Sequence, residues 1–335
     1  MKNTIKKLED GGVGRHWFFL FLGLTIAFAL NLVFVSPAVT AQDEVELSQD
    51  KLEKIKSVEA GDYVYVFCNP LDHTRVKKLI QGAEAPAELF DLEVKYFGPE
   101  EPYDADEVLA ILKKVIDQSP KGIAMEIGHP SKFDAAIGKA VEEGIYFVSF
   151  SIDDWTNNPR HGHIGYNWEK VGSDLADELL GDLPPNSNVL LLDSTNLMGR
   201  SCHLRTKSIT RRLNEYNFNY HIMNVEPEKG HIEDQVLEYV EENDLDGIIS
   251  LWEVITEPLA QVVAYNDLRS IRIGGFGFGR AGKYVKSGSL DVITEIETRL
   301  EGGIPLETLY YSAQYDVIPG TYHLHVEPIS TVKED

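Results

Sequence analysis

The sequence contains few cysteines and few basic residues. Only two cysteines occur in 335 residues, and no Cys-x-x-Cys or His-x-x-x-His spacing is present, so a disulfide scaffold and a structural zinc site are both disfavoured. The 31 lysines and arginines are outnumbered by 54 aspartates and glutamates, which gives a net charge of -23. A surface of that sign repels phosphate backbones. The composition therefore argues against a nucleic-acid partner.

Recognisable catalytic motifs are also lacking. The chain has no Gly-x-Ser-x-Gly nucleophile elbow, and its histidines form no evident pairing of a nucleophile with a base. The glycine-rich stretch at residues 275–279 lacks the Lys-Ser/Thr ending of a phosphate-binding loop and the spacing of a dinucleotide fingerprint. The sequence therefore predicts a protein that is not an enzyme and that holds neither a metal nor a cofactor.

The N-terminal segment differs from the rest of the chain. Basic residues precede an apolar run over residues 17–35, and Pro37 and small residues follow it. This order is that of an export signal, and Val39-Thr40-Ala41 predicts cleavage after Ala41, so that residues 1–41 form a signal peptide. The alternative is an uncleaved membrane anchor, because the run is nearly long enough to span a bilayer. Either way, the globular part is expected outside the cytoplasm, and the lack of a cysteine after the run argues against a lipoprotein.

From residue 61 onward, short apolar strands alternate with amphipathic helices. In the first half, strands are predicted at residues 63–67, 92–97, 122–127 and 145–150, with helices from about Thr74, after Asp104 or Asp106, and at 132–143. Val108, Ile111, Leu112, Val115 and Ile116 follow the spacing of one helical face, which predicts a helix packed against a sheet. This alternation is typical of a parallel sheet with helices on both faces.

The second half repeats the pattern. Strands are predicted at residues 163–166, 189–192, 220–225, 247–251, 271–276 and 292–295, and helices up to Gly181 and at 201–215, 232–242 and 258–265. A glycine turn is predicted at Gly302-Gly303, and an extended tail at 322–332. Two successive α/β units predict two doubly wound lobes. Their ligand should bind beyond the carboxyl ends of the strands.

Several local sequences, taken in order, resemble the type I periplasmic binding proteins of the ribose and galactose kind. They are Asn69-Pro70 after the first strand, Tyr166-Asn167 to Gly172 at the start of a helix, Arg205, Gly274-Gly275-Phe276 and residues 282–290. The resemblance covers nearly all of residues 61–335. It implies two doubly wound lobes that are joined by three crossovers and close over a small molecule.

The resemblance also implies lobe boundaries. The crossovers are expected near Tyr166-Asn167, near residues 295–297 and near Ile318. The N-terminal lobe would then comprise residues 42–166 and 297–318, and the C-terminal lobe residues 167–296 and 319–335. Cys68 and Cys202 would lie in opposite lobes, where a disulfide would hold the lobes together, so two free thiols are favoured.

Carrying the family pattern over residue by residue gives the candidate site. Arg205 matches the family's arginine after the sixth strand, and its forked guanidinium suits paired oxygens. Where the family often has Asn-Asp and Gly-Phe-Asp, this chain has Trp252-Glu253 and Gly277 in place of the acid. Two common hydroxyl-binding groups are thus absent. Both a cyclic polyol and a nitrogen-containing ring remain open as ligands.

The candidate ligand-binding residues follow the predicted strands. They are Asn69, Asp72, His129, Asp153, Trp155, Arg205, Trp252, Glu253 and Glu297. A tryptophan face stacks on a sugar or a planar ring, and a carboxylate accepts hydrogen bonds from hydroxyls or amines. Four of these residues also have a structural alternative: Trp155 can cover the hinge, His129 can form a turn with Pro130, and Glu253 and Glu297 can be solvated charges.

The function implied by the resemblance is that of a solute-binding protein. In this interpretation it captures a sugar or sugar-like molecule in the periplasm and delivers it to the membrane permease of an ABC-type importer. The alternative is a periplasmic sensor that presents its ligand to a membrane receptor, such as a histidine kinase or a chemoreceptor. Both partners would be membrane proteins, and neither function involves nucleic acid.

Overall fold

The structure is a computed structural model that describes residues 47–153, 157–194, 200–226, 232–266, 268, 270–278 and 281–330. The predicted signal peptide lies outside these ranges. No helix among the described residues is long and apolar enough to span a membrane.

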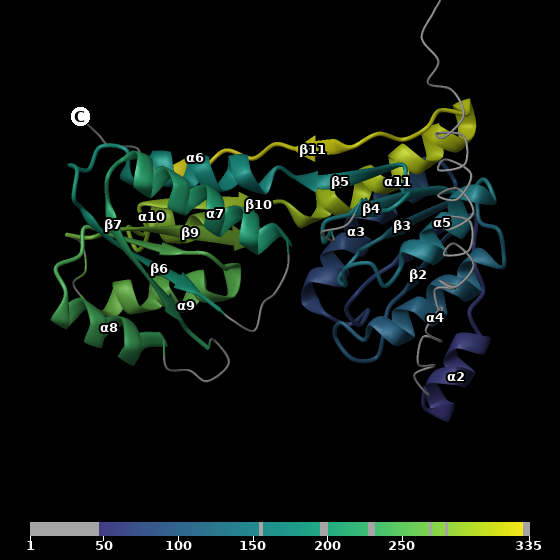
Figure 1. Cartoon of the computed structure of the whole chain (residues 1–335), viewed down its shortest axis with the longest axis horizontal. Coiled ribbons are helices and arrows are strands. Elements are labelled where there is room, and N and C mark those ends of the chain that lie inside the picture. Colours follow the sequence, from purple (N-terminus) through teal and green to yellow (C-terminus); the bar gives the residue numbers. More distant parts are fainter. Residues whose placement is uncertain are drawn as a thin grey trace, which may run out of the picture. The chain divides into compact units, whose positions relative to one another are not determined.

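The chain forms two six-stranded sheets, each at the centre of one lobe (Figure 1). The first lobe contains β1 (Tyr63–Val66), β2 (Val94–Phe97), β3 (Gly122–Met125), β4 (Tyr146–Phe150), β5 (Gly162–Tyr166) and β11 (Tyr322–Leu324). The second lobe contains β6 (Asn188–Asp193), β7 (Asn219–Asn224), β8 (Gly247–Ser250), β9 (Arg272–Phe278), β10 (Val292–Ile296) and β12 (Ile329–Ser330).

Both sheets have the same strand order. The first is β2-β1-β3-β4-β5-β11 and the second is β7-β6-β8-β9-β10-β12. All pairings are parallel except that of β12 with β10. In each lobe the chain reverses its direction of travel across the sheet once, between β1 and β3 and between β6 and β8. The predicted fold class, two doubly wound parallel-sheet lobes, is confirmed.

Helices pack on the two sheets. The first lobe has α2 (Gln49–Lys56), α3 (Thr74–Leu89), α4 (Ala105–Ile116), α5 (Asp134–Glu142) and α11 (Thr298–Tyr315). The second has α6 (Trp168–Leu180), α7 (Arg200–Glu215), α8 (Ile232–Glu242), α9 (Glu253–Tyr265) and α10 (Gly282–Lys286). Two predicted helix ends are confirmed: Asp104 caps α4 by accepting from the N–H groups of Asp106 and Glu107, and α6 ends at Gly181.

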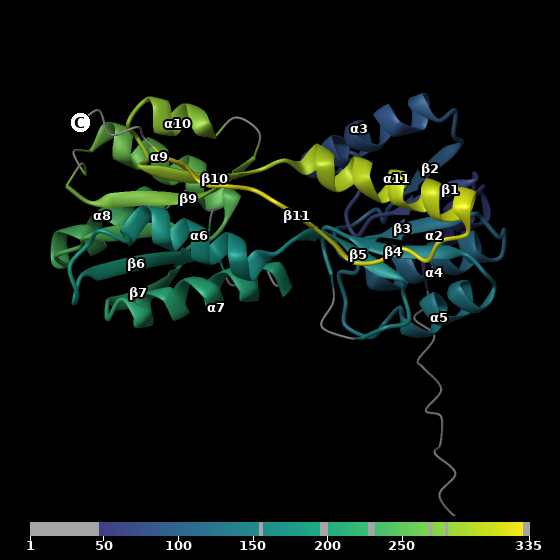
Figure 2. The same ribbon diagram turned by 90° about the horizontal axis from the view of Figure 1, so that it is seen from above.

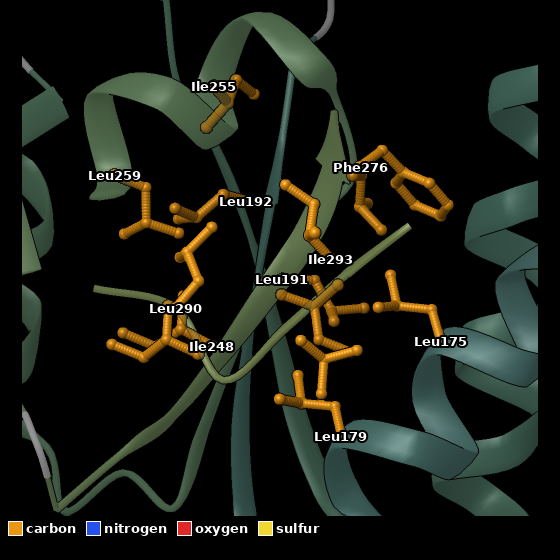
Figure 3. Packing of buried hydrophobic residues seen from close by; sticks show 14 of the residues in the cluster. Leu175, Leu179, Leu191, Leu192, Ile248, Ile255, Leu259, Phe276, Leu290 and Ile293 are labelled. Carbon is orange, nitrogen blue, oxygen red and sulfur yellow. The ribbon is translucent and has the colours of Figure 1, made fainter. Parts of the chain in front are cut away.

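Strand β6 of the second sheet shows why a short, continuous apolar run forms a strand in this fold. Residues 189–192 of β6 are all buried, because helices cover both faces of the sheet. Alternate side chains point to opposite faces. Leu191 points toward Leu175 and Leu179 of α6, and Leu192 toward α9 (Figure 3).

The third crossover lies later in the chain than the sequence predicts. β11 pairs with β5, so residues 322–324 belong to the first sheet, whereas Ile329 pairs with β10 in the second. The predicted position near Ile318 and the assignment of all of residues 319–335 to the C-terminal lobe are therefore wrong. Figure 2 shows β11 beside β5, before the chain continues to the second lobe. The cause is the free edge of β5, which can accept one more strand.

The predicted turn at Gly302-Gly303 is also wrong, because both glycines lie inside α11. A Cβ atom at Gly302 would overlap the carbonyl oxygen of Leu79 in α3, and one at Gly82 would overlap that of Arg299 in α11. These glycines allow the two helices to pack closely and do not end the helix. Tyr65, in β1, joins α11 to the sheet by donating a hydrogen bond to the Gly302 carbonyl oxygen at 2.6 Å.

Candidate functional site

In each lobe, the strand order places a ligand-binding position between two particular strands. Ligands of open α/β sheets bind beyond the carboxyl ends of the strands, at the point where the strand order reverses. That point lies between β1 and β3 in the first lobe and between β6 and β8 in the second. We call the residues around these two points the first-lobe floor and the second-lobe floor. The first-lobe floor comprises Cys68, Asn69, Arg75, Glu126, Ser151 and Glu301, and the second-lobe floor comprises Asp193, Arg205, Trp252 and Glu253.

The second-lobe floor is built around Arg205. This residue lies on α7, the helix that follows β6, and is 4% exposed. Its Nη1 atom donates to the carbonyl oxygen of Leu251 at 3.2 Å and to Glu253 Oε1 at 3.0 Å. Glu253, the first residue of α9, follows β8. The predicted guanidinium is thus present at this edge of the sheet, but Nη1 already binds groups of its own lobe.

Aromatic rings surround the same guanidinium. Its carbon atom lies 4.2 Å from the ring centroid of Trp168, 4.6 Å from that of Phe276 and 5.6 Å from that of Trp252. Cation–π contacts of this kind stabilise a charge that burial would otherwise disfavour. Arg205 is therefore a structural centre of the second lobe in addition to being a candidate ligand contact.

A hydrogen bond joins the two sides of the second-lobe floor. Trp252 follows β8, and its Nε1 atom donates to Asp193 Oδ1, at the end of β6, at 2.6 Å. The same oxygen accepts from the N–H of Ser194 at 2.8 Å. Trp252 is 9% exposed, so the structure brings Arg205, Trp252 and Glu253 together, as the sequence predicted, with most of their surface already buried.

The first-lobe floor contains a similar pair that the sequence analysis missed. Arg75, on the first turn of α3, donates from Nη1 to Glu126 Oε1 at 2.7 Å and from Nη2 to Ser151 Oγ. Glu126 directly follows β3 and is fully buried. Burial opposes the charge on Arg75, but Glu126 and Glu301 outweigh this effect and raise the arginine pKa. The signal in the sequence was an acidic residue at the end of an otherwise apolar strand.

Residues after β1 complete the first-lobe floor. The Cys68 N–H and Sγ atoms contact Glu126 Oε2 at 3.3 and 3.4 Å, which links the end of β1 to the end of β3. Burial, followed by the charge of Glu126, raises the Cys68 thiol pKa well above its usual value. Cys68 is a free thiol, whereas the Cys202 side chain lies outside the described part. Asn69 is 5% exposed and donates to Cys68 Sγ at 3.4 Å.

Three of the predicted site residues are exposed. Asp72 lies in the loop before α3, and His129 Nδ1 contacts the carbonyl oxygen of Pro130 at 2.9 Å, as in the alternative turn interpretation. Glu297 caps α11 by accepting from the Arg299 N–H at 3.1 Å. Its backbone N–H also donates to the Tyr166 hydroxyl at 3.0 Å, which joins the first two crossovers.

Asp153 is held by neighbours of its own lobe. Its Oδ2 atom pairs with Arg160 Nη2 at 2.9 Å, and its Oδ1 atom accepts from Ser149 Oγ at 3.2 Å. Trp155 lies outside the described residues. The Asp153 side chain is 9% exposed, and its ligand-binding role stays a prediction.

The two floors provide hydrogen-bonding groups and aromatic faces. The described residues contain no cluster of three or more histidine, cysteine, aspartate or glutamate side chains placed to hold a metal. The carboxylates, guanidinium groups and indole rings can bind a polar ring and orient it. Fold and floors together define a two-lobed ligand-binding protein.

The family comparison agrees with this class. The model of the periplasmic binding protein domain family matches residues 64–315, and the chain belongs to that family. It is accordingly a solute-binding protein. No curated protein matches the sequence.

Solved structures share the fold at low sequence identity. An arabinose-binding protein from Geobacillus stearothermophilus is 21% identical, with a TM-score of 0.66, over 80% of this chain and 96% of that one. A solute-binding protein of an ABC transporter from Actinobacillus succinogenes, with bound D-allose, is 16% identical, with a TM-score of 0.69, over 80% and 97%. A periplasmic sugar-binding protein from Legionella pneumophila is 18% identical, with a TM-score of 0.65, over 78% and 98%.

Proposed function

We propose that this protein is the solute-binding component of an ABC-type importer and that it captures a sugar or a sugar-like molecule. The lobes close over the ligand by bending at the crossovers, and the closed form delivers the ligand to a membrane permease. The sugar-binding proteins that share the fold support this assignment, as does the family to which the chain belongs. Hinge closure around a ligand is a common motion of two-lobed binding proteins.

The observation that carries the proposal is the repetition of one arrangement in both lobes. An arginine on the helix after the first strand pairs with a glutamate that follows the third strand, as Arg75–Glu126 and as Arg205–Glu253. Each pair lies where a doubly wound sheet binds its ligand. Two such floors, one in each lobe, suit a ligand held between them without chemical change.

Direct ligand contacts are proposed for residues at the rims of these floors. Asn69 and Asp72 would contact the ligand from the first lobe, and Trp252 and Glu253 from the second. His129, Asp153, Trp155 and Glu297 are further candidates that follow strands. Arg205 would act mainly by fixing the positions of Glu253 and Trp252.

The proposed location is the periplasm. The order of basic residues, apolar run and small residues in the first 41 positions supports export, and family membership agrees with it. N-terminal sequencing of the exported protein would identify a cut after Ala41. An intact N-terminus in a membrane fraction would instead indicate an anchor.

A ligand screen tests the proposed function. The purified protein is heated with sugars, polyols, nucleosides and amines, and compounds that co-purify are identified by mass spectrometry. A bound ligand raises the melting temperature by mass action. We expect at least one sugar or sugar-like compound to do so and to be recovered unchanged. Stabilisation by none of these compounds, or chemical conversion of the one that binds, would reject the assignment.

One substitution tests the rim contacts once a ligand is known. Asp72→Asn removes a charged acceptor from an exposed position, so affinity should fall by about tenfold while the melting temperature of the ligand-free protein stays the same. Asp50→Asn, at an exposed position on α2, is the matched control and should change neither. Equal affinities of the two variants in calorimetry would remove Asp72 from the site.

A further inference from the structure

Glu301 is a buried carboxylate that the proposed function does not use. It lies on the first turn of α11, just after the second crossover, and is 1% exposed. Its Oε1 atom has no hydrogen-bond partner among the described residues. A buried carboxylate whose oxygens are only partly hydrogen-bonded is costly to ionise. A group with that cost, at this end of the sheet, requires an explanation.

The neighbours of Glu301 come from several elements of the first-lobe floor and from α9. They are Arg75 on α3, Glu126 after β3, Ser151 after β4, Tyr166 at the end of β5 and Glu253 on α9. Cys68, after β1, adds a thiol next to Glu126. The only cation in this set is Arg75. The first-lobe floor therefore contains two carboxylates, Glu126 and Glu301, for one guanidinium.

Arg75 does not neutralise both carboxylates. Its Nη1 atom binds Glu126 and its Nη2 atom binds Ser151. Burial raises the pKa of Glu301 to about 7, and Glu126 and Glu253 act in the same direction, while Arg75 and a hydrogen bond from Ser151 oppose them. Glu301 therefore changes from mostly neutral to mostly charged over the neutral pH range.

The described residues of the second-lobe floor do not offset this surplus. Arg205 and Glu253 form a pair of one cation and one anion, with side chains 5% and 7% exposed. A further carboxylate among the described residues of that floor is Asp193, whose Oδ1 atom accepts from an indole N–H and a backbone N–H, which are uncharged donors. Across the described residues of both floors, the balance is negative. A negative binding position attracts cationic groups and repels anionic ones.

We infer that the ligand carries a protonated amine and that Glu301 is the residue that selects it. This inference rests on the proposed function and narrows the ligand to a sugar-like molecule that carries an amine. Glu301 acts through its charge and is a positioning residue, because its side chain is 1% exposed and is therefore shielded from direct contact with a ligand. A neutral sugar gains little from this charge, and a uronic acid is repelled by it.

Three compounds with the same ring and a different charge test the inference. D-Glucose, 6-amino-6-deoxy-D-glucose and D-glucuronate differ only at carbon 6, and the corresponding galactose series covers the other common stereochemistry. Affinities are measured by calorimetry at pH 6 and pH 8, for the wild type, Glu301→Gln and Glu307→Gln. Glu307 is an exposed residue on the same helix and provides the matched control.

In the series that binds, we expect the amine to bind about tenfold more tightly than the neutral sugar at pH 8, and the uronate to bind most weakly. The preference for the amine should shrink at pH 6, where Glu301 is largely protonated, and should be absent in Glu301→Gln at both pH values. Glu307→Gln should behave like the wild type. A structural role alone would not produce this pH profile.

Results that contradict the inference can be distinguished from results that contradict the proposed function. Preferred binding of the neutral sugar or the uronate would overturn the inference while leaving the sugar-binding function intact. An amine preference that persists unchanged in Glu301→Gln would show that another group selects it, which also overturns the inference. Failure of every sugar, of any charge, to bind would count against the proposed function as well as the inference.

Discussion

In the second lobe one buried arginine faces one carboxylate, whereas in the first lobe one arginine faces two. The two arginines occupy matching positions, on α3 after β1 and on α7 after β6, and their first partners follow β3 and β8. Arg205 is enclosed by three aromatic rings. Arg75 instead meets Ser151 and the additional acid Glu301.

The difference indicates a division of roles. The Arg205 guanidinium, enclosed by aromatic rings, has few other partners than Glu253. The pair therefore fixes one arrangement of α7, β8 and α9. A floor with a surplus carboxylate is less stable at high pH and responds to charges brought near it. We therefore assign the stability of the second lobe to the Arg205–Glu253 pair. Ligand selectivity is assigned to Arg75, Glu126 and Glu301 of the first lobe.

The largest expected effect is that of Arg205→Ala on stability. The substitution leaves Glu253 buried without its cation and removes the group that three rings surround, so the free energy of unfolding should fall by about 3–5 kcal/mol. Urea denaturation measures it. Arg211→Ala, on the same helix with a side chain 55% exposed, should cost less than about 0.5 kcal/mol. Similar losses in both variants would mean that the buried pair does not fix the second lobe.

Glu301→Gln should stabilise the protein, by an amount that depends on pH. The folded-state pKa of Glu301 is about 7, above the ordinary value of 4.5. Between these two values the unfolded chain has lost a proton that the folded chain keeps, so wild-type stability falls as pH rises from about 4.5 to about 7 and then levels off. Glu301→Gln removes this loss of stability. At pH 8 the free energy of unfolding of the variant should exceed that of the wild type by about 3 kcal/mol.

The measurement is urea denaturation of the wild type, Glu301→Gln and Glu307→Gln at pH 4.5, 6 and 8. Below about pH 4.5 the three proteins should have similar stability, and only Glu301→Gln should separate from the others as pH rises. A difference that does not vary with pH would show that Glu301 does not titrate in this range.

A smaller effect is expected from helix packing, and it also differs between the lobes. A Cβ at Gly302 would overlap a backbone oxygen of α3, whereas a Cβ at Gly172 in α6 would meet chiefly the side chain of Ser208, which can rotate. Gly302→Ala should therefore cost about 2–3 kcal/mol, and Gly172→Ala about 1 kcal/mol.

Gly138→Ala, in α5, provides the control, because the added Cβ would lie 3.6 Å from its nearest neighbour, Pro159 Cγ. Alanine should stabilise this helix by up to about 1 kcal/mol. Thermal melts of the three variants rank their changes in stability. Equal costs for Gly302→Ala and Gly172→Ala would contradict the closer backbone contact in the first lobe.

Most of the fold follows from local pattern. Turn residues mark the ends of the strands and helices, and apolar periodicity marks their buried faces. Both are local signals. The two errors involve contacts between distant segments. Gly302 resembles a turn residue until α3 is known to pack against it, and the pairing of β11 depends on the free edge of β5.

The candidate site could be predicted only in part. Arg205 was predicted from the family resemblance, and Trp252 and Glu253 because they follow a strand; the structure brings the three side chains together, and their ligand-binding roles stay predictions. Arg75 and Glu301 could not be found in this way, since charged residues near a helix start are common on exposed surfaces. Their burial becomes evident only when α3 and α11 pack beside the sheet.

Small-angle X-ray scattering with and without the identified ligand tests the central claim most directly. Closure of two lobes around a bound molecule predicts a smaller radius of gyration when saturating ligand is added, and the original value once the ligand is dialysed away. An unchanged radius at full occupancy would contradict capture by hinge closure.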